Sequence, residues 1–293
     1  MKKIAIIVPF HLSLRDVLRR YQVPAHLDEN IERIFVYDGI LENLNENTDY
    51  SDIKNTIVLS NKLANGAGGC RNIGLASTNC EKIIFCDSDD FINFDALHDI
   101  VLDSPPADII YCFSNSKFGD INGEDAYRHI GYNECIEKYI SSHDGEDLKT
   151  VYVPWSKIFD REFLVKHSIH FNEVEASNDA VFSIRALLQA NKIQATKRSF
   201  YTVIDHPKSL TKNLTSSSVW CRLNQLIEYN LLIREKTNWK LHPMSAQILL
   251  CFKASLVLGL KSILLVYSHR LPIFYSLKHL LRIIHRQGFK LLK

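Results

Sequence analysis

The sequence predicts an α/β fold with a mostly parallel sheet flanked by helices, followed by a helical C-terminal extension. Short continuous apolar runs alternate with helical stretches over roughly the first 110 residues, and such runs are typical of strands buried on both faces. Strand and helix alternation favours a parallel sheet. From Val219 onward the chain is apolar at helical spacing, with breaks at Pro243 and Pro272.

The expected elements follow from where each apolar run ends. The first run stops at Pro9, the second at Asp38-Gly39 and the fourth at Asp87. The expected strands are residues 4–8, 34–37, 56–59, 82–86, 109–113 and 150–153. The expected helices are residues 15–21, 71–76 and 178–191, with a loop of small residues at 64–69. We place the domain boundary after residue 215, which gives domains 1–215 and 216–293.

Composition excludes several classes of protein. The 293 residues are 46% hydrophobic and 23% charged, which is typical of a folded protein and not of a disordered or collagenous one. Seven cysteines without a CxxC pair indicate neither a disulfide framework nor a zinc site. The apolar run at the N-terminus is too short for a signal peptide, so we expect a cytoplasmic protein.

Charge is distributed unevenly along the chain. Ten of the 35 Lys and Arg residues lie in 236–293, which has no Asp or Glu, and 1–235 holds 25 basic against 33 acidic residues. The acidic body argues against a nucleic-acid partner. The basic segment 273–286 places apolar residues on one face of a helix, which favours peripheral contact with an anionic membrane or, nearly equally, docking on the first domain. The apolar stretch 246–267 is interrupted by Lys253 and Lys261, so burial or an interfacial position is favoured over a spanning helix.

An acidic cluster, Asp87-Ser88-Asp89-Asp90, directly follows a predicted buried strand. Three neighbouring carboxylates repel one another, and a divalent cation such as Mg²⁺ or Mn²⁺ would offset that repulsion. The alternative is an acidic loop that caps the next helix.

A glycine-rich segment precedes this cluster and contains Arg71. Glycines allow close approach of the backbone, and an arginine offers a fork of donors to phosphate. The GxxxxGK[ST] and GxGxxG patterns are absent, which argues against a P-loop or a Rossmann dehydrogenase. Taken alone, the segment favours the simpler interpretation, a tight loop with a surface arginine.

Four motifs in order resemble the family 2 glycosyltransferases of the GT-A fold. They are Ile-Ile-Val-Pro-Phe at 6–10, Val-Tyr-Asp-Gly at 36–39, Cys-Arg-Asn-Ile-Gly at 70–74 and Ile-Phe-Cys-Asp-Ser-Asp-Asp at 84–90. The resemblance covers about the first 210 residues and includes Trp-Ser-Lys at 155–157, similar to the family's Trp-Asn-Lys, and Ser-Asn-Asp at 177–179. It implies a nucleotide-sugar donor and a saccharide or lipid-linked saccharide acceptor in bacterial surface-glycan synthesis.

The resemblance also implies roles for single residues. Pro9 and Phe10 would cradle the nucleotide base, Asp38 would accept a hydrogen bond from uracil, and Arg71 would contact the nucleotide. Asp87, Ser88 and Asp89 match the family's DxD motif, in which the two Asp hold ribose and, through Mn²⁺ or Mg²⁺, the diphosphate.

An inverting transfer needs a carboxylate that removes the proton of the acceptor hydroxyl, and the resemblance assigns this role to Asp179. The residues alone would also fit an acid beside a helix N-terminus. Two positions depart from the family: Asn178 replaces the Glu of its usual Glu-Asp, and Tyr37 replaces the first Asp of its Asp-Asp-Gly-Ser.

Three further residues have two interpretations each. Trp155 either stacks on a sugar or lies in the core, Lys157 either reaches a phosphate or is solvated, and His206 is either a metal ligand or an ordinary loop residue. The expected function is that of an inverting, metal-dependent glycosyltransferase with a UDP-linked donor. The alternatives are a nucleotidyltransferase, or a catalytically inactive glycan-binding module suggested by Asn178.

Overall fold

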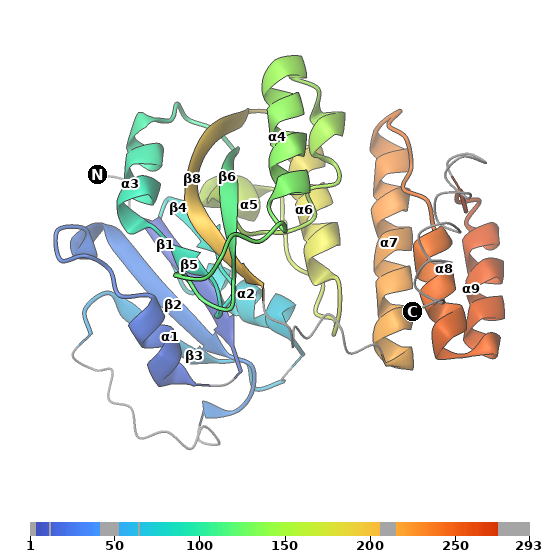
Figure 1. Cartoon of the computed structure of the whole chain (residues 1–293), viewed down its shortest axis with the longest axis horizontal. Helices are drawn as coiled ribbons and strands as arrows, with labels where there is room; N and C mark the ends of the chain where they lie inside the picture. The colour runs from blue at the N-terminus through green and yellow to red at the C-terminus, as the bar shows by residue number, and fades with distance from the viewer. Residues whose placement is uncertain (1–3, 12, 42–52, 64, 206–214, 275–293) are drawn as a thin grey trace. The chain divides into compact units, whose positions relative to one another are not determined.

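The computed structural model describes residues 4–11, 13–41, 53–63, 65–205 and 215–274 (Figure 1). The chain divides into two compact units, Met1–Leu210 and Thr211–Lys293. The first holds the sheet, and the second holds the C-terminal helices.

In the described part of the first unit, eight strands form one sheet in the order β3-β2-β1-β4-β7-β6-β8-β5. The strands are β1 (Ile4–Phe10), β2 (Ile31–Tyr37), β3 (Thr56–Ser60), β4 (Lys82–Phe85), β5 (Phe91–Ile92), β6 (Ile109–Phe118), β7 (Lys157–Asp160) and β8 (Ile193–Asp205). β1 to β4 run parallel and β6 pairs in parallel with β8, whereas β7 is antiparallel to β4 and β6, and β5 to β8. The predicted α/β fold is confirmed, with a sheet that is mixed.

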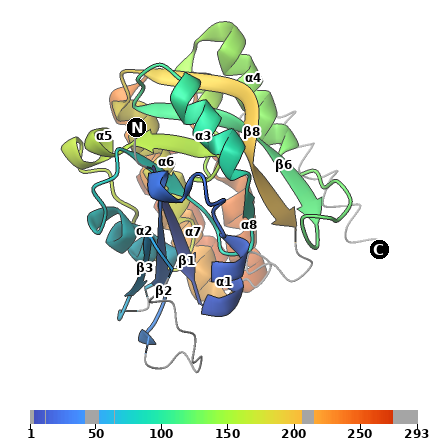
Figure 2. The ribbon, with the colours of Figure 1, turned by 90° about the vertical axis from the view of Figure 1, so that its left-hand side faces the viewer.

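Helices cover both faces of this sheet. They are α1 (Leu14–Arg20), α2 (Ala67–Ala76), α3 (Phe94–Asp103), α4 (Ile130–Ser142), α5 (Arg161–Lys166) and α6 (Asn178–Gln189), with short 3-10 turns η1 (Asp28–Asn30) and η3 (Gly145–Leu148). α1 and α2 lie on opposite faces of β1, β2 and β3 (Figures 1 and 2). Right-handed crossovers produce this arrangement when the direction of strand addition reverses between β3 and β4.

The central parallel strands β1 and β4 are buried on both faces, as their continuous apolar runs predict, whereas β3 is half-buried. Every residue of β1 and β4 is buried. Phe85 of β4 contacts the rings of Phe159, Phe171 and Phe182, so an aromatic core fixes the strand that precedes the acidic cluster.

Two sequence predictions about local structure are wrong. Residues 150–153 form no strand. Val151 packs in the core, so burial of an irregular segment accounts for the apolar residue there. The segment 64–69 is not wholly a loop, since α2 begins at Ala67 and places Gly68 and Gly69 in its first turn. A Cβ on Gly68 would meet the Asn172 carbonyl oxygen at 2.5 Å, so close packing of the helix requires glycine there.

The second unit contains α7 (Ser216–Lys236), α8 (Ser245–Ala254) and α9 (Leu256–Ser268). Thr215 begins α7 with a capping box completed by Ser218. Pro243 and Pro272 both lie outside the helices, as predicted. Across the described ranges, none of the helices has the length and apolar character needed to cross a bilayer. Most of the predicted amphipathic segment 273–286 lies outside the described residues.

Candidate functional site

Polar and charged side chains gather at the carboxyl ends of β1, β2 and β4. Because these strands are parallel neighbours, the residues that follow them meet at one edge of the sheet, where open α/β sheets bind ligands. The Asp38 N–H donates to the Phe10 carbonyl at 2.8 Å, which ties the ends of β1 and β2 together.

Asp38 is held by residues that follow β3. Its Oδ1 accepts hydrogen bonds from Asn61 Nδ2 at 2.8 Å and from the Gly66 N–H at 3.2 Å. Asn61 is buried and also donates to Asn65 Oδ1 at 2.7 Å. Sequence reasoning missed Asn61, because an asparagine after a strand carries no signal of a long-range partner.

The three acids of the cluster have different environments. Asp87 is half-buried, Asp89 is exposed, and Asp90 is buried. Asp90 accepts hydrogen bonds from the Tyr201 hydroxyl and the Ile204 N–H, each at 2.7 Å. Burial, reinforced by the charges of Asp87 and Asp89, raises the pKa of Asp90 well above its ordinary value. Asp90 therefore has a structural role, and Asp87 and Asp89 are the two acids left facing outward.

The backbone of the cluster is held in place by neighbouring elements. The Tyr21 hydroxyl donates to the Asp87 carbonyl at 2.6 Å, and Arg20 Nη1 donates to the Asp89 carbonyl at 2.8 Å. The Asp87 N–H donates to the Tyr201 hydroxyl at 3.1 Å. Sequence analysis did not identify these residues, because the C-terminal end of α1 and the middle of β8 carry no motif.

Arg71 supplies the positive charge that the acidic cluster requires. Arg71 is buried, and its Nη2 lies 2.6 Å from Oδ1 of the partly exposed Asp87. Its Nη1 donates a hydrogen bond to Asn178 Oδ1 at 3.2 Å. An arginine of the chain itself therefore offsets part of the negative charge of the cluster. Asn178, the departure from the family's Glu-Asp, provides a neutral acceptor for the arginine fork.

Asp179 is the second residue of α6, and its Oδ1 accepts a hydrogen bond from the Ala180 N–H at 3.0 Å. Burial raises the pKa of Asp179, the Arg71 charge lowers it, and the Asp87 charge raises it again. The net direction is upward, which suits a carboxylate that accepts a proton. Asp38, Arg71, Asp87 and Asp179, which come from separate parts of the sequence, thus belong to one region of the fold.

Trp155 and Lys157, two of the predicted donor-contacting residues, are both buried in this structure. Lys157 has 0% exposure, and its Nζ donates to the Val151 carbonyl at 2.9 Å. Burial lowers the pKa of Lys157 to about 7. Trp155 is buried and stacks on Tyr201 with ring centroids 5.5 Å apart. Lys157 is the first residue of β7, which lies between β4 and β6 in the sheet, and this interior position explains the burial of its side chain.

The remaining predicted site residues are Pro9, Phe10, Ser88 and His206. Pro9 and Phe10 are buried, and the Phe10 ring packs 5.3 Å from the Tyr37 ring, so Phe10 supports the edge of the site. Ser88 is half-buried between Asp87 and Asp89. His206 lies outside the described residues.

The side chains at this edge could bind a divalent cation such as Mg²⁺ only if a substrate supplied some of the ligands. Within the described residues, no group of three or more His, Cys, Asp or Glu could hold a metal ion by itself. Two outward carboxylates fit the way Mg²⁺ is usually bound, by one or two carboxylates together with substrate phosphates and water. Asp87 and Asp89 are the residues that could hold such an ion.

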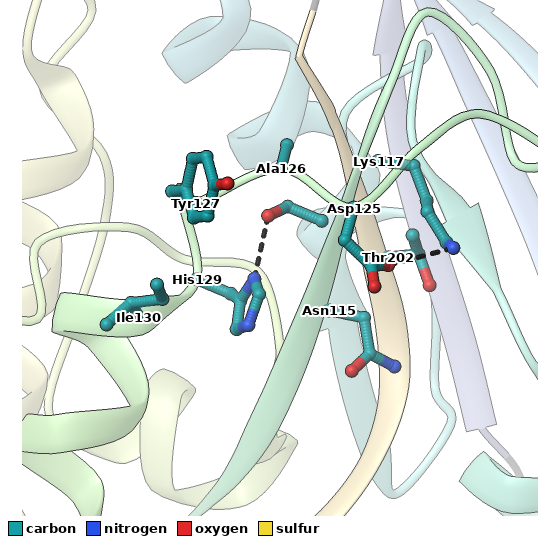
Figure 3. A pocket seen from close by; sticks show the side chains of 9 residues that line it. Asn115, Lys117, Asp125, Ala126, Tyr127, His129, Ile130 and Thr202 are labelled. Atoms are coloured by element: carbon teal, nitrogen blue, oxygen red, sulfur yellow. Dashed lines mark hydrogen bonds and ion pairs between the residues drawn. The ribbon is translucent and has the colours of Figure 1, made fainter.

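A second feature is a cavity of about 450 Å³ beside β6 and β8 (Figure 3). His129 Nδ1 lies 2.7 Å from Ser116 Oγ, and Lys117 Nζ lies 2.9 Å from Asp125 Oδ1. Tyr127, which is 74% exposed, presents its ring at the rim. Thr202, which lines the cavity, lies on β8 next to Tyr201. It pairs with Phe91 of β5, the residue that directly follows the acidic cluster.

Comparison with known proteins finds a similar family for the first part of the chain. Residues 5–105 match the family described as "Glycosyltransferase like family 2". This part of the chain is therefore similar to the family 2 glycosyltransferases. It contains the ends of β1, β2 and β4 and therefore most of the edge described above.

Two curated relatives resemble the chain over longer stretches than the family match. EpsH of Bacillus subtilis (strain 168) is 26% identical over 193 residues, covering 63% of this chain and 55% of EpsH. The poly(ribitol-phosphate) β-N-acetylglucosaminyltransferase TarS of Staphylococcus aureus (strain Mu50 / ATCC 700699) is 24% identical over 173 residues, covering 57% of this chain and 29% of TarS. The chain thus spans about half of EpsH and less than a third of TarS.

Solved structures of TarS confirm the predicted GT-A fold. Crystallised residues 1–349 of S. aureus TarS in complex with UDP-GlcNAc superpose with a TM-score of 0.61 at 19% identity, covering 86% of this chain and 71% of that one. The same fragment without a named ligand gives a TM-score of 0.58. At this identity, the likeness establishes the fold.

Proposed function

We propose that the protein is an inverting, metal-dependent glycosyltransferase that moves a sugar from a UDP-linked donor to a saccharide acceptor in bacterial surface-glycan synthesis. The observation that carries the proposal is the convergence of Asp38, Arg71, Asp87 and Asp179 on one region of the sheet edge. The TarS structures named for UDP-GlcNAc and UDP support a uridine nucleotide as the donor carrier.

The donor would bind across the ends of β1, β2 and β4. Asp38 would accept the uracil N–H, since Asn61 and Gly66 already hold its carboxylate in place. Arg71 would offer its fork to the phosphates, which compete with Asp87 for the same donors. Asp87 and Asp89 would hold Mn²⁺ or Mg²⁺, which when bound acts as a Lewis acid toward the diphosphate.

Asp179 would act as the general base. Its carboxylate would take the proton of the acceptor hydroxyl while that oxygen bonds to the anomeric carbon, and the bond to UDP breaks with its electron pair leaving on the phosphate oxygen. The raised pKa of Asp179 strengthens it as a proton acceptor. Asn178 does not remove this function, because the asparagine contacts Arg71 and leaves the Asp179 carboxylate in place.

The acceptor would bind in the cavity beside β6 and β8. Its lining combines an exposed tyrosine ring with amide, imidazole and hydroxyl groups, which together suit the apolar face and the hydroxyls of a sugar. A lipid-linked saccharide as acceptor would require the enzyme to work at the cytoplasmic face of a membrane and to contact it through the C-terminal helices.

The decisive experiment measures UDP release by the full chain from a panel of UDP-sugars, with Mn²⁺ and with EDTA. We expect EDTA and Asp89→Ala to weaken donor binding, and Asp179→Asn to abolish transfer while donor binding persists. Glu134→Gln, an exposed acid on α4, is the matched control and should behave as wild type. Unchanged transfer by both Asp89→Ala and Asp179→Asn would remove the site assignment. Donor binding without any turnover in wild type would favour the inactive glycan-binding module.

A further inference from the structure

Helix α9 presents a row of large apolar side chains to solvent. Leu256, Val257, Leu260, Leu264 and Tyr267 are 53–79% exposed. Their spacing places them within one face of the helix. Single exposed apolar residues are ordinary on a protein surface, whereas a contiguous apolar row marks a surface that binds something.

The opposite face of α9 is already occupied, so the row cannot turn inward. Gly259, Ser262 and Val266 are buried there. A Cβ on Gly259 would overlap the Phe252 ring of α8, which shows that the two helices approach as closely as glycine allows. The small residues fix which face of α9 packs on α8, and the apolar row lies away from it.

Charge identifies the kind of partner. The segment 236–293 has ten Lys and Arg and no Asp or Glu. In its described part, Lys253 and Lys261 are exposed, and Lys261 lies at the edge of the apolar row beside Leu260. The same segment of a second copy would bring like charges together, whereas an anionic lipid surface offers opposite charge around an apolar interior.

We propose that the α9 row (Leu256, Val257, Leu260, Leu264 and Tyr267) docks the protein on an anionic bilayer, with Lys253 and Lys261 at the lipid headgroups. Thirteen residues make α9 about 20 Å long, which is shorter than a hydrocarbon core of about 30 Å. The helix therefore lies in the plane of the interface with its apolar face in the acyl boundary.

This inference is tested without donor or acceptor, so it stands or falls separately from the transfer reaction. Full-length protein is floated with vesicles of pure phosphatidylcholine and with vesicles of phosphatidylcholine and phosphatidylglycerol. We expect binding to the anionic vesicles that weakens as salt is added. Leu260→Ser with Leu264→Ser should weaken binding at least about tenfold. The matched control is Leu102→Ser, a residue of α3 with the same 53% exposure as Leu260, and it should float as wild type does.

Charge reversal separates the two contributions. Lys253→Glu and Lys261→Glu should each weaken binding about fivefold or more, because a cation near an anionic surface contributes about that factor. Lys166→Glu, an exposed lysine of α5, is the control. Equal flotation of wild type and the Leu260→Ser, Leu264→Ser variant would overturn the proposal. A second result would also overturn it: wild-type protein does not bind anionic vesicles but is a dimer by light scattering, and the Leu260→Ser, Leu264→Ser variant is a monomer. A second copy of the chain would then cover the row.

Discussion

Tyr201 and Asp90 are joined by a hydrogen bond of 2.7 Å between a buried hydroxyl and a buried carboxylate. The same hydroxyl accepts the Asp87 N–H at 3.1 Å, so one oxygen atom connects β8 to both ends of the acidic cluster. The cluster is therefore held from a strand that lies more than a hundred residues further along the chain.

Replacing Tyr201 with Phe tests this connection. The variant leaves the Asp90 carboxylate without one partner and the Asp87 N–H without its acceptor, so the free energy of unfolding should fall by about 1–3 kcal/mol. Urea denaturation measures the change. Tyr127→Phe removes an exposed hydroxyl of the same type and should leave stability unchanged. A Tyr201→Phe variant as stable as wild type would mean that the hydrogen bond contributes nothing to the fold.

Gly69 and Gly131 make a matched pair in helices. A Cβ on Gly69 would overlap Asn65 Oδ1 and meet Asn61 Nδ2 at 3.0 Å, so Gly69→Ala should disturb the residues that hold Asp38. We expect a loss of about 1–3 kcal/mol in the free energy of unfolding. Around Gly131 of α4 a Cβ meets nothing within 4 Å, and Gly131→Ala should stabilise by up to about 1 kcal/mol. Thermal unfolding would contradict the argument if both variants changed in the same direction.

Lys157 predicts a pH dependence of stability. Its pKa is about 7 in the folded protein against an ordinary value of 10.5, so the unfolded chain binds the proton more tightly. The contribution of Lys157 to stability is complete above pH 10.5 and is lost as pH falls through about 7.

Wild type should therefore gain stability relative to Lys157→Met as pH rises from 7 to 10.5, by at most about 1.4 kcal/mol per pH unit. Urea unfolding of both proteins across this range measures the difference. Lys166→Met, at an exposed position, should run parallel to wild type. A constant difference between wild type and Lys157→Met would show that Lys157 keeps its proton in the folded protein.

Tyr127→Ala tests whether the cavity beside β6 and β8 holds the acceptor. Loss of the exposed ring should raise KM for the acceptor while donor hydrolysis in its absence stays as in wild type. Aromatic stacking contributes about 0.5–1.5 kcal/mol, which corresponds to a change of roughly two- to tenfold. Tyr127→Phe is the control, since it keeps the exposed ring and should leave the acceptor KM close to that of wild type. A change in donor hydrolysis without a change in acceptor KM would place Tyr127 elsewhere in the reaction.

Local sequence was enough to predict the strands and helices that build the site. Apolar runs predicted β1, β2 and β4, and the polar residues Asp38 and Asp87 marked where β2 and β4 end, because buried parallel strands need continuous apolar residues. β1 runs beyond its predicted end, through Pro9 to Phe10. The same reasoning placed Asp179 at the start of α6, since an acid at a helix N-terminus is a local signal.

Long-range packing decided the rest. Arg71 pairs with Asp87, Asp90 lies under Tyr201, and Lys157 and Trp155 point into the core. None of these facts could be read from neighbouring residues, because the burial of a side chain and the partner of a charge depend on which distant segments the sheet brings together. The pattern along the chain thus set where polar groups occur, and the fold set which of them are paired, buried or left facing a substrate.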